Sequence, residues 1–445
     1  MQSINRYFRL PLLQGVLWSA FFLLPSLVSQ DIESLNTGRI LVREFRDLGE
    51  LGKDVLSLAW SADGRQLLVD KMVSGRFYGI FIIDLATQTM KSVSQGSNGI
   101  GSGINANNAS PAWSGDGRYI LFCGQESSSN KFNRTGPGYG LHSNLWITDM
   151  SNGGFHRLTM NGFSMSNPKG TVYPYFSPDG QKVIWTAILG QARSGSFMGR
   201  RGITMAELQR DRNGNIELGK SLDLTPGNQQ DFYECYGFLP DGKKILMAAN
   251  LSDRQPWFGM DLYFLDIDSR EVQPLTETLG VWDRFAALSP KGEKIVWSSS
   301  MECTVPSLGS GGKLWEKYLS TELWMMNKDG SGKRQMTGFN QRNAKEYTKV
   351  RSVVGMSAWH PNGREIALVL LKEGRNYELE SSVIIIELDD AFTPPLTPVK
   401  APAEPAATTA EPAATTAEPA ATTAEPAATT AEPAATTAEP AATTA

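Results

Sequence analysis

Basic and aromatic residues that could bind an anion occur in two short stretches of the chain. They are Arg193, Arg200 and Arg201 in the first stretch and Lys313, Trp315 and Lys317 in the second. Arginine binds carboxylates and phosphates through paired hydrogen bonds, and tryptophan offers a flat apolar face to a ring. These residues predict a site for an anionic sugar or a carboxylate. The competing interpretation is that they are solvated loop residues, with Trp315 packed on its own structural unit.

A second set of polar residues could surround the mouth of a channel. It consists of Asp54, Asn107, Asn108, Asp231, Glu234, Asp283, Arg284 and Arg351. Each lies just before one of the short apolar stretches that we assign to the innermost strands of a ring. Such residues either hold a ligand or ion, or they hydrogen-bond to the protein and seal the channel.

Motifs of known enzymes are missing or incomplete in this chain. Three histidines and three widely spaced cysteines cannot supply a zinc site of four cysteines or a CxxCH haem attachment. No Gly-x-Ser-x-Gly motif is followed by an α/β domain, and the glycine-rich stretches Ser310–Leu314 and Asp329–Lys333 lack the spacing of a phosphate-binding loop. We therefore predict no metal and no cofactor, and we find no catalytic signature.

The elements that must position these residues come from an internal repeat. One phrase, an aromatic residue or leucine followed by Ser-Pro-Asp-Gly or a variant of it, occurs six times. The copies are Ala59–Arg65, Ala112–Arg118, Tyr175–Gln181, Gly237–Lys243, Ala287–Glu293 and Ala358–Arg364. Glycine supplies a positive φ, and Asp or its replacement occupies the turn position before it. Because apolar residues flank the phrase on both sides, each copy predicts a tight hairpin.

Each hairpin is followed by a third apolar strand, and most units show a fourth. The third strands are expected at residues 80–84, 145–149, 202–205, 262–266, 323–327 and 383–387. Four antiparallel strands repeated around a ring form a β-propeller, so six copies predict an all-β, six-bladed propeller. The last unit lacks a fourth strand, whereas Arg39–Phe45 is a strand with no blade of its own. We expect this strand to complete the sixth blade and close the ring.

The six phrases resemble the PD40 or WD40-like repeats of the TolB family, over roughly residues 39–390. TolB is the periplasmic component of the Tol-Pal envelope system. The resemblance therefore implies an exported propeller with an envelope protein as its partner and a link to Tol-Pal-type transport. TolB carries an α/β domain ahead of its propeller, but only about 28 residues separate the N-terminal apolar stretch from Trp60. We accordingly expect the domain and arm that engage TolA to be missing.

The two ends of the chain differ from the repeats. Arg6 and Arg9 precede the apolar stretch Leu10–Val28, which is the pattern of a secretory signal over residues 1–30; an uncleaved anchor is the alternative. From Glu404 onward Glu-Pro-Ala-Ala-Thr-Thr-Ala repeats every seven residues, and its prolines oppose a helix. We expect residues 401–445 to be an extended, disordered tail, and residues 31–400 to form the propeller in the periplasm or outside the cell.

The charge of the predicted propeller is balanced. Two of the 42 Lys and Arg lie in residues 1–30 and six of the 46 Asp and Glu lie in residues 401–445, which leaves 40 of each sign. A chain without net charge has no long-range field for nucleic acid or for an anionic membrane surface. We expect no nucleic-acid partner, membrane contact only through the signal, an anchor or a partner, and a monomer.

Strand alternation places the short turns of all blades on one face and the longer loops on the other. Long loops on a rigid scaffold are where binding is expected. This favours a non-enzymatic protein-binding scaffold in the cell envelope. The alternative is a carbohydrate-directed lyase or hydrolase that uses the long-loop face. Several carboxylates converging with an arginine in one pocket would favour the enzyme, and a broad apolar surface would favour protein binding.

Overall fold

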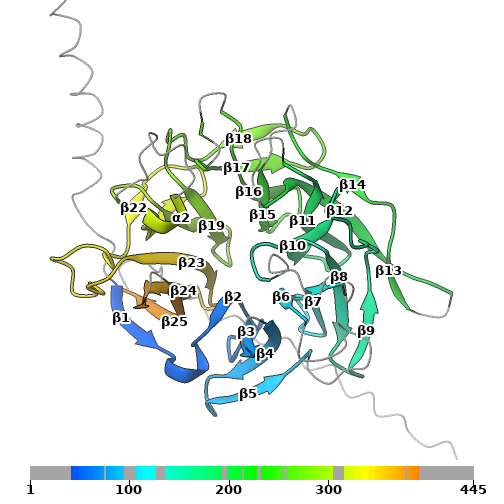
Figure 1. Ribbon diagram of the computed structural model, residues 1–445, viewed down its shortest axis with the longest axis horizontal. Helices are drawn as coiled ribbons and strands as arrows, with labels where there is room; N and C mark the ends of the chain where they lie inside the picture. Colours follow the sequence, from blue (N-terminus) through cyan, green and yellow to red (C-terminus); the bar gives the residue numbers. More distant parts are fainter. Residues whose placement is uncertain are drawn as a thin grey trace, which may run out of the picture. The chain divides into compact units, whose positions relative to one another are not determined.

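Six antiparallel sheets stand around a central axis in the computed structural model, as Figure 1 shows. The model describes residues 42–74, 77–94, 106–126, 136–192, 198–212, 215–227, 232–252, 255–256, 258–303, 315–375 and 378–389. The all-β, six-bladed propeller predicted from the repeats is confirmed. The predicted signal at 1–30 and the predicted tail at 401–445 lie outside the described residues.

Each blade begins with its innermost strand and ends with its outermost one. Blades 1 and 2 contain β2 (Val55–Trp60), β3 (Gln66–Ser74), β4 (Phe77–Asp84) and β5 (Thr89–Ser92), then β6 (Asn108–Trp113), β7 (Tyr119–Gln125), β8 (Ser143–Asp149) and β9 (Gly154–Arg157). Blade 3 contains β10 (Gly170–Phe176), β11 (Lys182–Gly190), β12 (Arg200–Arg210), β13 (Ile216–Leu218) and β14 (Leu222–Asp223). Both β13 and β14 pair with β12, so blade 3 has one strand more than predicted.

The remaining blades have four strands each. Blades 4 and 5 contain β15 (Tyr233–Phe238), β16 (Lys244–Ala249), β17 (Asp261–Asp266) and β18 (Val272–Pro274), then β19 (Asp283–Leu288), β20 (Lys294–Ser299), β21 (Glu322–Asn327) and β22 (Arg334–Gln335). Blade 6 contains β23 (Ser352–Trp359), β24 (Glu365–Glu373), β25 (Leu379–Leu388) and β1 (Val42–Asp47). A 3-10 turn, η1 (Gly49–Leu51), and a one-turn helix, α2 (Trp315–Tyr318), lie in the connections.

The ring is closed by the N-terminal strand, as the sequence predicted. β1 pairs antiparallel with β25, and Phe45 stands opposite Ile386. The ring of Phe45 packs edge-on against Phe339 of the segment that enters blade 6, with centroids 5.9 Å apart. The strand begins at Val42 in the described chain rather than at the predicted Arg39, because residues 39–41 lie outside the described part. An outer strand taken from the other end of the sequence removes the free edge that blade 6 would otherwise have.

The hairpin turns of blades 1 to 3 repeat the same hydrogen bonds. In blade 1 the Ser61 hydroxyl donates to Asp63 Oδ1 at 2.6 Å, and the same oxygen accepts the backbone N–H of Arg65 at 3.0 Å. Blade 2 repeats this with Ser114, Asp116 and Arg118 at 2.5 and 3.0 Å. These bonds lower the pKa of Asp63 and Asp116, since they favour the ionised carboxylate.

A second repeated hydrogen-bond pattern occurs at the end of the outer strand in five blades. The backbone N–H of an apolar residue donates to the third strand, and the hydroxyl of the next residue accepts an N–H from that strand. In blade 2, Leu158 N donates to Leu145 O at 2.8 Å, and Thr159 Oγ1 accepts from Leu145 N at 2.9 Å. The pairs are Val93-Ser94, Leu158-Thr159, Leu224-Thr225, Leu275-Thr276 and Met336-Thr337. In each recurring Leu-Thr pair, the threonine hydroxyl therefore takes the place of a backbone carbonyl in the hydrogen-bond ladder, at the point where the backbone leaves the sheet.

The hydrophobic core is divided among the interfaces between blades. Among the described residues, seven buried clusters occur. Six of them each join two neighbouring blades, and the seventh is a small group formed by Phe258, Trp282, Leu319 and Val353. Alternation along a strand produces this: in β3, Leu67 and Val69 pack toward blade 6, whereas Leu68 packs toward blade 2. No helix in the described part of the chain has the length and hydropathy to cross a membrane.

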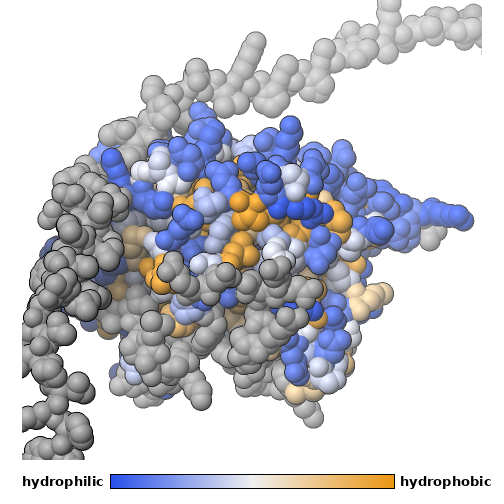
Figure 2. All heavy atoms as spheres, turned by 90° about the horizontal axis from the view of Figure 1, so that it is seen from above, coloured by the Kyte–Doolittle hydropathy of each residue, from blue (hydrophilic) through white to orange (hydrophobic). Residues whose placement is uncertain are grey.

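Two faces of the ring follow from the strand directions. The innermost strands all run from the face that carries the second-to-third and interblade loops, the loop face, to the face that carries the hairpin turns, the turn face. Blade 3 also projects sideways: in the edge-on view of Figure 2 the β12–β13 hairpin extends from the rim and is hydrophilic, and a hydrophobic patch lies nearer the centre.

Candidate binding sites on the loop face and in the channel

A buried cluster of charged residues lies at the loop-face end of blades 3 to 5. Glu234 is the second residue of β15, Arg284 is the second residue of β19, and Arg201 reaches them from β12. All three side chains are almost fully buried. The sequence placed Glu234 and Arg284 at the channel mouth and Arg201 in the basic loop-face site. The structure brings the three residues together in one cluster.

Glu234 is saturated by donors from the protein. Its Oε1 is ion-paired with both Arg201 and Arg284. Its Oε2 accepts from Arg284 Nε at 2.9 Å and from the Tyr236 hydroxyl at 2.8 Å. With both oxygens accepting two hydrogen bonds, Glu234 is not available as a general base, and it ties three blades together.

Aromatic rings surround the two guanidinium groups of this cluster. Arg284 Cζ lies 4.8 Å from the ring centre of Phe285 and 5.0 Å from that of Trp282. Arg201 Cζ lies 4.9 Å from the ring centre of Phe232. Among the described residues, the cluster contains two cations but only one carboxylate. The negative faces of the aromatic rings stabilise the second cation. Asp231, predicted to belong to the same mouth, lies outside the described residues.

A second buried network contains two carboxylates. Asp283 accepts the indole N–H of Trp297 at 3.0 Å, and the Thr278 hydroxyl lies 3.1 Å from Asp283 Oδ2 and 3.2 Å from Asp261 Oδ1. Burial raises the pKa of both carboxyls, and that of Asp261 rises to about 6, with the charge of Asp283 contributing. Both groups accept several protein donors, so they form a structural network. No three His, Cys, Asp or Glu side chains gather as a possible metal site in the described part.

The other predicted channel-mouth residues hydrogen-bond between elements. Asn107 Oδ1 accepts the Tyr78 backbone N–H at 3.1 Å, and Asn108 Nδ2 donates to the Ser94 hydroxyl at 3.3 Å, so both connect blade 2 to blade 1. Arg351 donates to Glu373 Oε2 at 2.6 Å and to the Leu319 carbonyl at 2.9 Å. Asp54 adopts a φ of 60°, and its backbone N–H donates to Ser381 O at 3.0 Å. These contacts join blades 1, 2, 5 and 6 around the mouth.

The predicted basic site on the loop face is only partly within the described residues. Arg193 and Lys313 lie outside them, and Trp315 belongs to α2 but its side chain is not described. Lys317 is exposed in the same helix. Arg200 is half-buried and donates to the Leu189 carbonyl at 3.4 Å, whereas the next residue, Arg201, points to the opposite side of β12 and into the buried cluster. The first arginine group is therefore divided between two environments.

Exposed apolar side chains are concentrated on the loop face. Ten large hydrophobic residues are exposed in the described part of the chain. Eight of them lie in the loops of this face or at the strand ends beside it: Val73, Met160, Phe163, Met165, Leu279, Tyr318, Val350 and Leu379. The other two, Met90 and Leu222, lie on the outer strands β5 and β14. Met160 has the largest exposed fraction, 77%.

The interblade loop between blades 2 and 3 carries three of these residues. Met160, Phe163 and Met165 occur within residues 158–169, and the Phe163 ring packs on buried His142 with centroids 4.6 Å apart. Burial lowers the pKa of His142, which therefore stays neutral under this loop. A supported aromatic ring flanked by two flexible thioethers is a surface that can adapt to an apolar partner.

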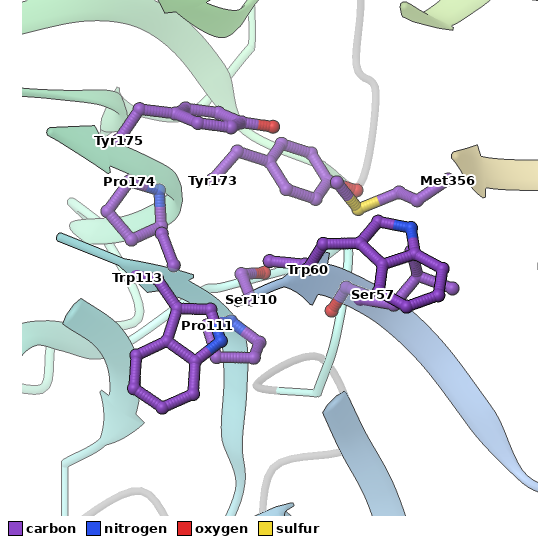
Figure 3. Close-up of a pocket in the computed structure, with 12 residues that line it drawn as sticks. Ser57, Trp60, Ser110, Pro111, Trp113, Tyr173, Pro174, Tyr175 and Met356 are labelled. Atoms are coloured by element: carbon purple, nitrogen blue, oxygen red, sulfur yellow. The ribbon is translucent and has the colours of Figure 1, made fainter. Parts of the chain in front are cut away.

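A cavity of about 140 Å³ lies in the central channel, farther from the loop face than the charged cluster. Figure 3 shows its wall, formed by the innermost strands β2, β6 and β10 with Met356 of β23. Its lining includes the indoles of Trp60 and Trp113, the rings of Tyr173 and Tyr175, and the Ser110 hydroxyl. The described side chains that line it include no carboxylate, histidine, lysine or arginine.

β-Bulges shape the wall of this cavity. The register of β6 against β7 shifts between Ala109 and Ala112, and that of β10 against β11 shifts between Val172 and Tyr175. Within these bulges Ser110 and Tyr173 adopt positive φ angles of 53° and 51°, which are uncommon for residues other than glycine. An extra residue in each strand places these two side chains on the channel wall.

Sequence reasoning did not single out Ser110 and Tyr173 of this wall, or Met160, Phe163 and Met165 of the loop face. Ser110 and Tyr173 each lie three residues before the aromatic of their motif and directly before a proline, and this shared position was a usable signal. A second signal was Asp70, a charged residue in the apolar second strand of blade 1. It is fully buried and accepts the backbone N–H groups of Ser57 at 2.8 Å and Ser110 at 2.9 Å, so it holds two wall strands together.

By fold the chain is a six-bladed β-propeller, and its repeated phrase resembles that of the TolB family. No family model matches it, and no curated protein matches it in sequence. Similar solved structures include TolB from Acinetobacter baumannii, which is 20% identical with a TM-score of 0.40; the match covers 62% of this chain and 53%, about half, of that protein. A TolB-type protein from Agrobacterium tumefaciens is 17% identical with a TM-score of 0.46, over 75% of this chain and 90% of the other.

Solved structures of other kinds of protein resemble this chain to a similar extent. An oligogalacturonate lyase from Vibrio parahaemolyticus is 10% identical with a TM-score of 0.43, and the match covers 80% of this chain and all of that protein. At this level of identity the comparisons concern the fold alone, and one fold supports many functions. They assign no activity to this chain.

Proposed function

We propose that this protein is a non-enzymatic scaffold that holds a protein partner on its loop face, in the periplasm or cell envelope. The observation that carries the proposal is the one-sided distribution of exposed large apolar residues: of the ten in the described part of the chain, eight lie on that face. A broad surface with apolar side chains on loops of several blades suits a protein partner, because such side chains gain most when a large surface leaves water.

The ionisable residues support a binding role over a catalytic one. Glu234 accepts hydrogen bonds at both oxygens, and among the residues that the structure describes no carboxylate, histidine or lysine lines the central cavity. A general acid or base must reach a substrate proton, and these groups do not offer that arrangement. The export signal predicted from Arg6, Arg9 and Leu10–Val28 supports the location.

The test compares two variants that remove exposed apolar side chains from different places; those of the loop-face variant are 57–77% exposed and those of the control 40–44%. The loop-face variant carries Met160→Ser, Met165→Ser and Leu279→Ser. The control variant carries Met90→Ser and Leu222→Ser, which lie on outer strands. Each protein is immobilised and exposed to envelope extracts, and retained proteins are quantified by mass spectrometry against the unchanged chain.

We expect a protein that the unchanged chain and the control retain equally, and that the loop-face variant retains at least about tenfold less. Loss of one well-buried methionine contact is worth about 1.5–3 kcal/mol, which alone exceeds a factor of ten. Equal loss from both variants would contradict the proposal. So would cleavage of an acidic polysaccharide by the unchanged chain, since that is the activity expected of the alternative.

A further inference from the structure

The central cavity contains a buried hydroxyl without a hydrogen-bond partner. Ser110 is 3% exposed, and its Oγ has no partner among the residues that the structure describes. The neighbouring hydroxyl on the wall, that of Ser57, is by contrast bonded to Asp70. Figure 3 shows the Ser110 hydroxyl between the rings of Tyr173 and Trp60 and the Pro111 ring, on the side of the cavity. A buried polar group left unpaired is unfavourable, so a partner from outside the chain would be bound there.

A second unpaired donor belongs to another residue that lines the same cavity. The motif tryptophans occupy equivalent positions in blades 1, 2 and 6. Trp60 Nε1 donates to the Ala358 carbonyl and Trp359 Nε1 donates to the Ala287 carbonyl, both at 3.2 Å on the preceding blade. Trp113 departs from this pattern, because its buried Nε1 has no partner in the described part of the chain. In Figure 3 its nitrogen-bearing edge is on the side of Pro111 and Ser110.

The lining restricts the chemistry of a ligand. Indole, phenol and pyrrolidine rings and the Met356 thioether form most of the wall, so an apolar ring is favoured. In the described part of the lining no side chain is charged, so the desolvation of a charged ligand would be uncompensated. A dry cavity of about 150 Å³ in another protein holds one benzene molecule, and the present volume of about 140 Å³ is similar.

We propose that the channel cavity is a binding site for a neutral, single-ring molecule that carries a hydrogen-bond acceptor, held by the Ser110 hydroxyl and the Trp113 indole N–H. The ring stacks among Trp60, Tyr173 and Met356, and the acceptor meets the two unpaired donors. This site is separate from the loop face, so it is independent of the proposed partner binding. Ser110 is a ligand-binding residue in this assignment, and Asp70 positions it through the Ser110 backbone N–H.

The experiment measures the binding of three probes to the full chain by ligand-observed NMR and by the fluorescence of the tryptophans. Phenol is neutral and carries an acceptor, benzene has the ring alone, and benzoate adds a charge. We expect phenol to bind more tightly than benzene and benzoate not to bind. The substitutions Ser110→Ala and Trp113→Phe should each weaken phenol about three- to tenfold, the effect of one hydrogen bond, and leave benzene unchanged.

Ser357→Ala is the matched control. Ser357 also lies on an innermost strand, is 7% exposed and has an unpaired hydroxyl in the described part, but it does not line the cavity. It should leave phenol binding unchanged, and the thermal unfolding of all variants is compared to exclude misfolding. The assignment is overturned if phenol produces no signal at millimolar concentrations, which would mean that water alone fills the cavity. It is also overturned if Ser357→Ala weakens phenol as much as Ser110→Ala, or if benzoate binds as well as phenol.

Discussion

Carboxylate side chains lie in opposite environments on the two faces of the ring. On the turn face, Asp63, Asp116 and Asp179 are exposed and their pKa values are lowered by a serine hydroxyl and a backbone N–H. At the loop-face ends of the strands, Asp261, Asp283 and Glu322 are buried and their pKa values are raised by burial. Blades 1 to 3 repeat one local solution on the turn face. On the loop face Asp261 and Asp283 share one network and Glu322 belongs to another.

The difference indicates where each face obtains its stability. A turn closes within five residues, so its aspartate needs only local partners, and the same serine-to-aspartate bond recurs in blades 1, 2 and 3. A loop-face end must connect blades whose connections differ in length, so its polar groups bond across blades. The exposed apolar residues lie mostly on the loop face, where the repeat fixes the sequence least. The residues of this face can therefore serve binding.

The largest expected effect comes from the buried charge cluster. Glu234→Gln should lower the free energy of unfolding by about 3–5 kcal/mol, because it leaves Arg201 and Arg284 buried without an anion. Urea denaturation measures this. The control is Glu293→Gln on the turn face, whose ion pair with Lys328 is more than half exposed and should contribute below about 1 kcal/mol. Equal effects would mean that the two faces do not differ in this way.

Next in size is a turn-face comparison between two glycines with nearly the same φ. Gly64 and Gly117 have φ values of +72° and +71°, but a Cβ on Gly64 would lie 2.2 Å from His360 Nε2, whereas nothing lies within 4 Å of one on Gly117. Gly117→Ala should cost about 1–2 kcal/mol from backbone strain alone. Gly64→Ala should cost about 1 kcal/mol more, because the His360 contact with the Gly64 carbonyl is lost. Thermal denaturation of both variants would show equal losses if the turns were fully independent.

A third prediction concerns the pH dependence of stability. The pKa of Asp261 is about 6 in the folded chain and 3.8 as the ordinary value, so the folded state binds the proton more tightly. Stability from this group is therefore present below pH 4 and falls as the pH rises toward 6, by about 1–2 kcal/mol. Asp261→Asn should flatten this decline in urea titrations between pH 4 and 6. An unchanged slope would assign the decline to other carboxyls.

The smallest expected effect belongs to the exposed apolar residues. Met160→Ser should change the free energy of unfolding by less than about 0.5 kcal/mol, because its side chain is 77% exposed. The same variant should reduce partner retention in the capture experiment. A clear loss of stability in chemical denaturation would instead mean that the loop packs on the ring, and the comparison between faces would weaken.

Most of the fold could be predicted from the sequence because its information is local and repeated. The Asp-Gly turns, the flanking apolar strands and the Leu-Thr ends each depend on a few adjacent residues, and six copies reinforce one another. Even the closing strand could be placed, because blade 6 lacked an outer strand and the residues near Val42 formed a strand without a blade. The prediction of blade 3 was less complete. Both β13 and β14 pair with β12, and the extra length of β12 is not encoded by the repeat.

The sites depended on contacts between blades. The sequence placed Arg201 with Arg200, but strand alternation and the arrival of Glu234 from the next blade moved it into the buried cluster. Ser110 and Tyr173 became wall residues through bulges, and Trp113 lost the acceptor that Trp60 and Trp359 retain. The sequence by itself determined the turns, the blades and their number. Only the tertiary structure decided which polar groups are paired, because a pairing between blades depends on the positions of residues far apart in the chain.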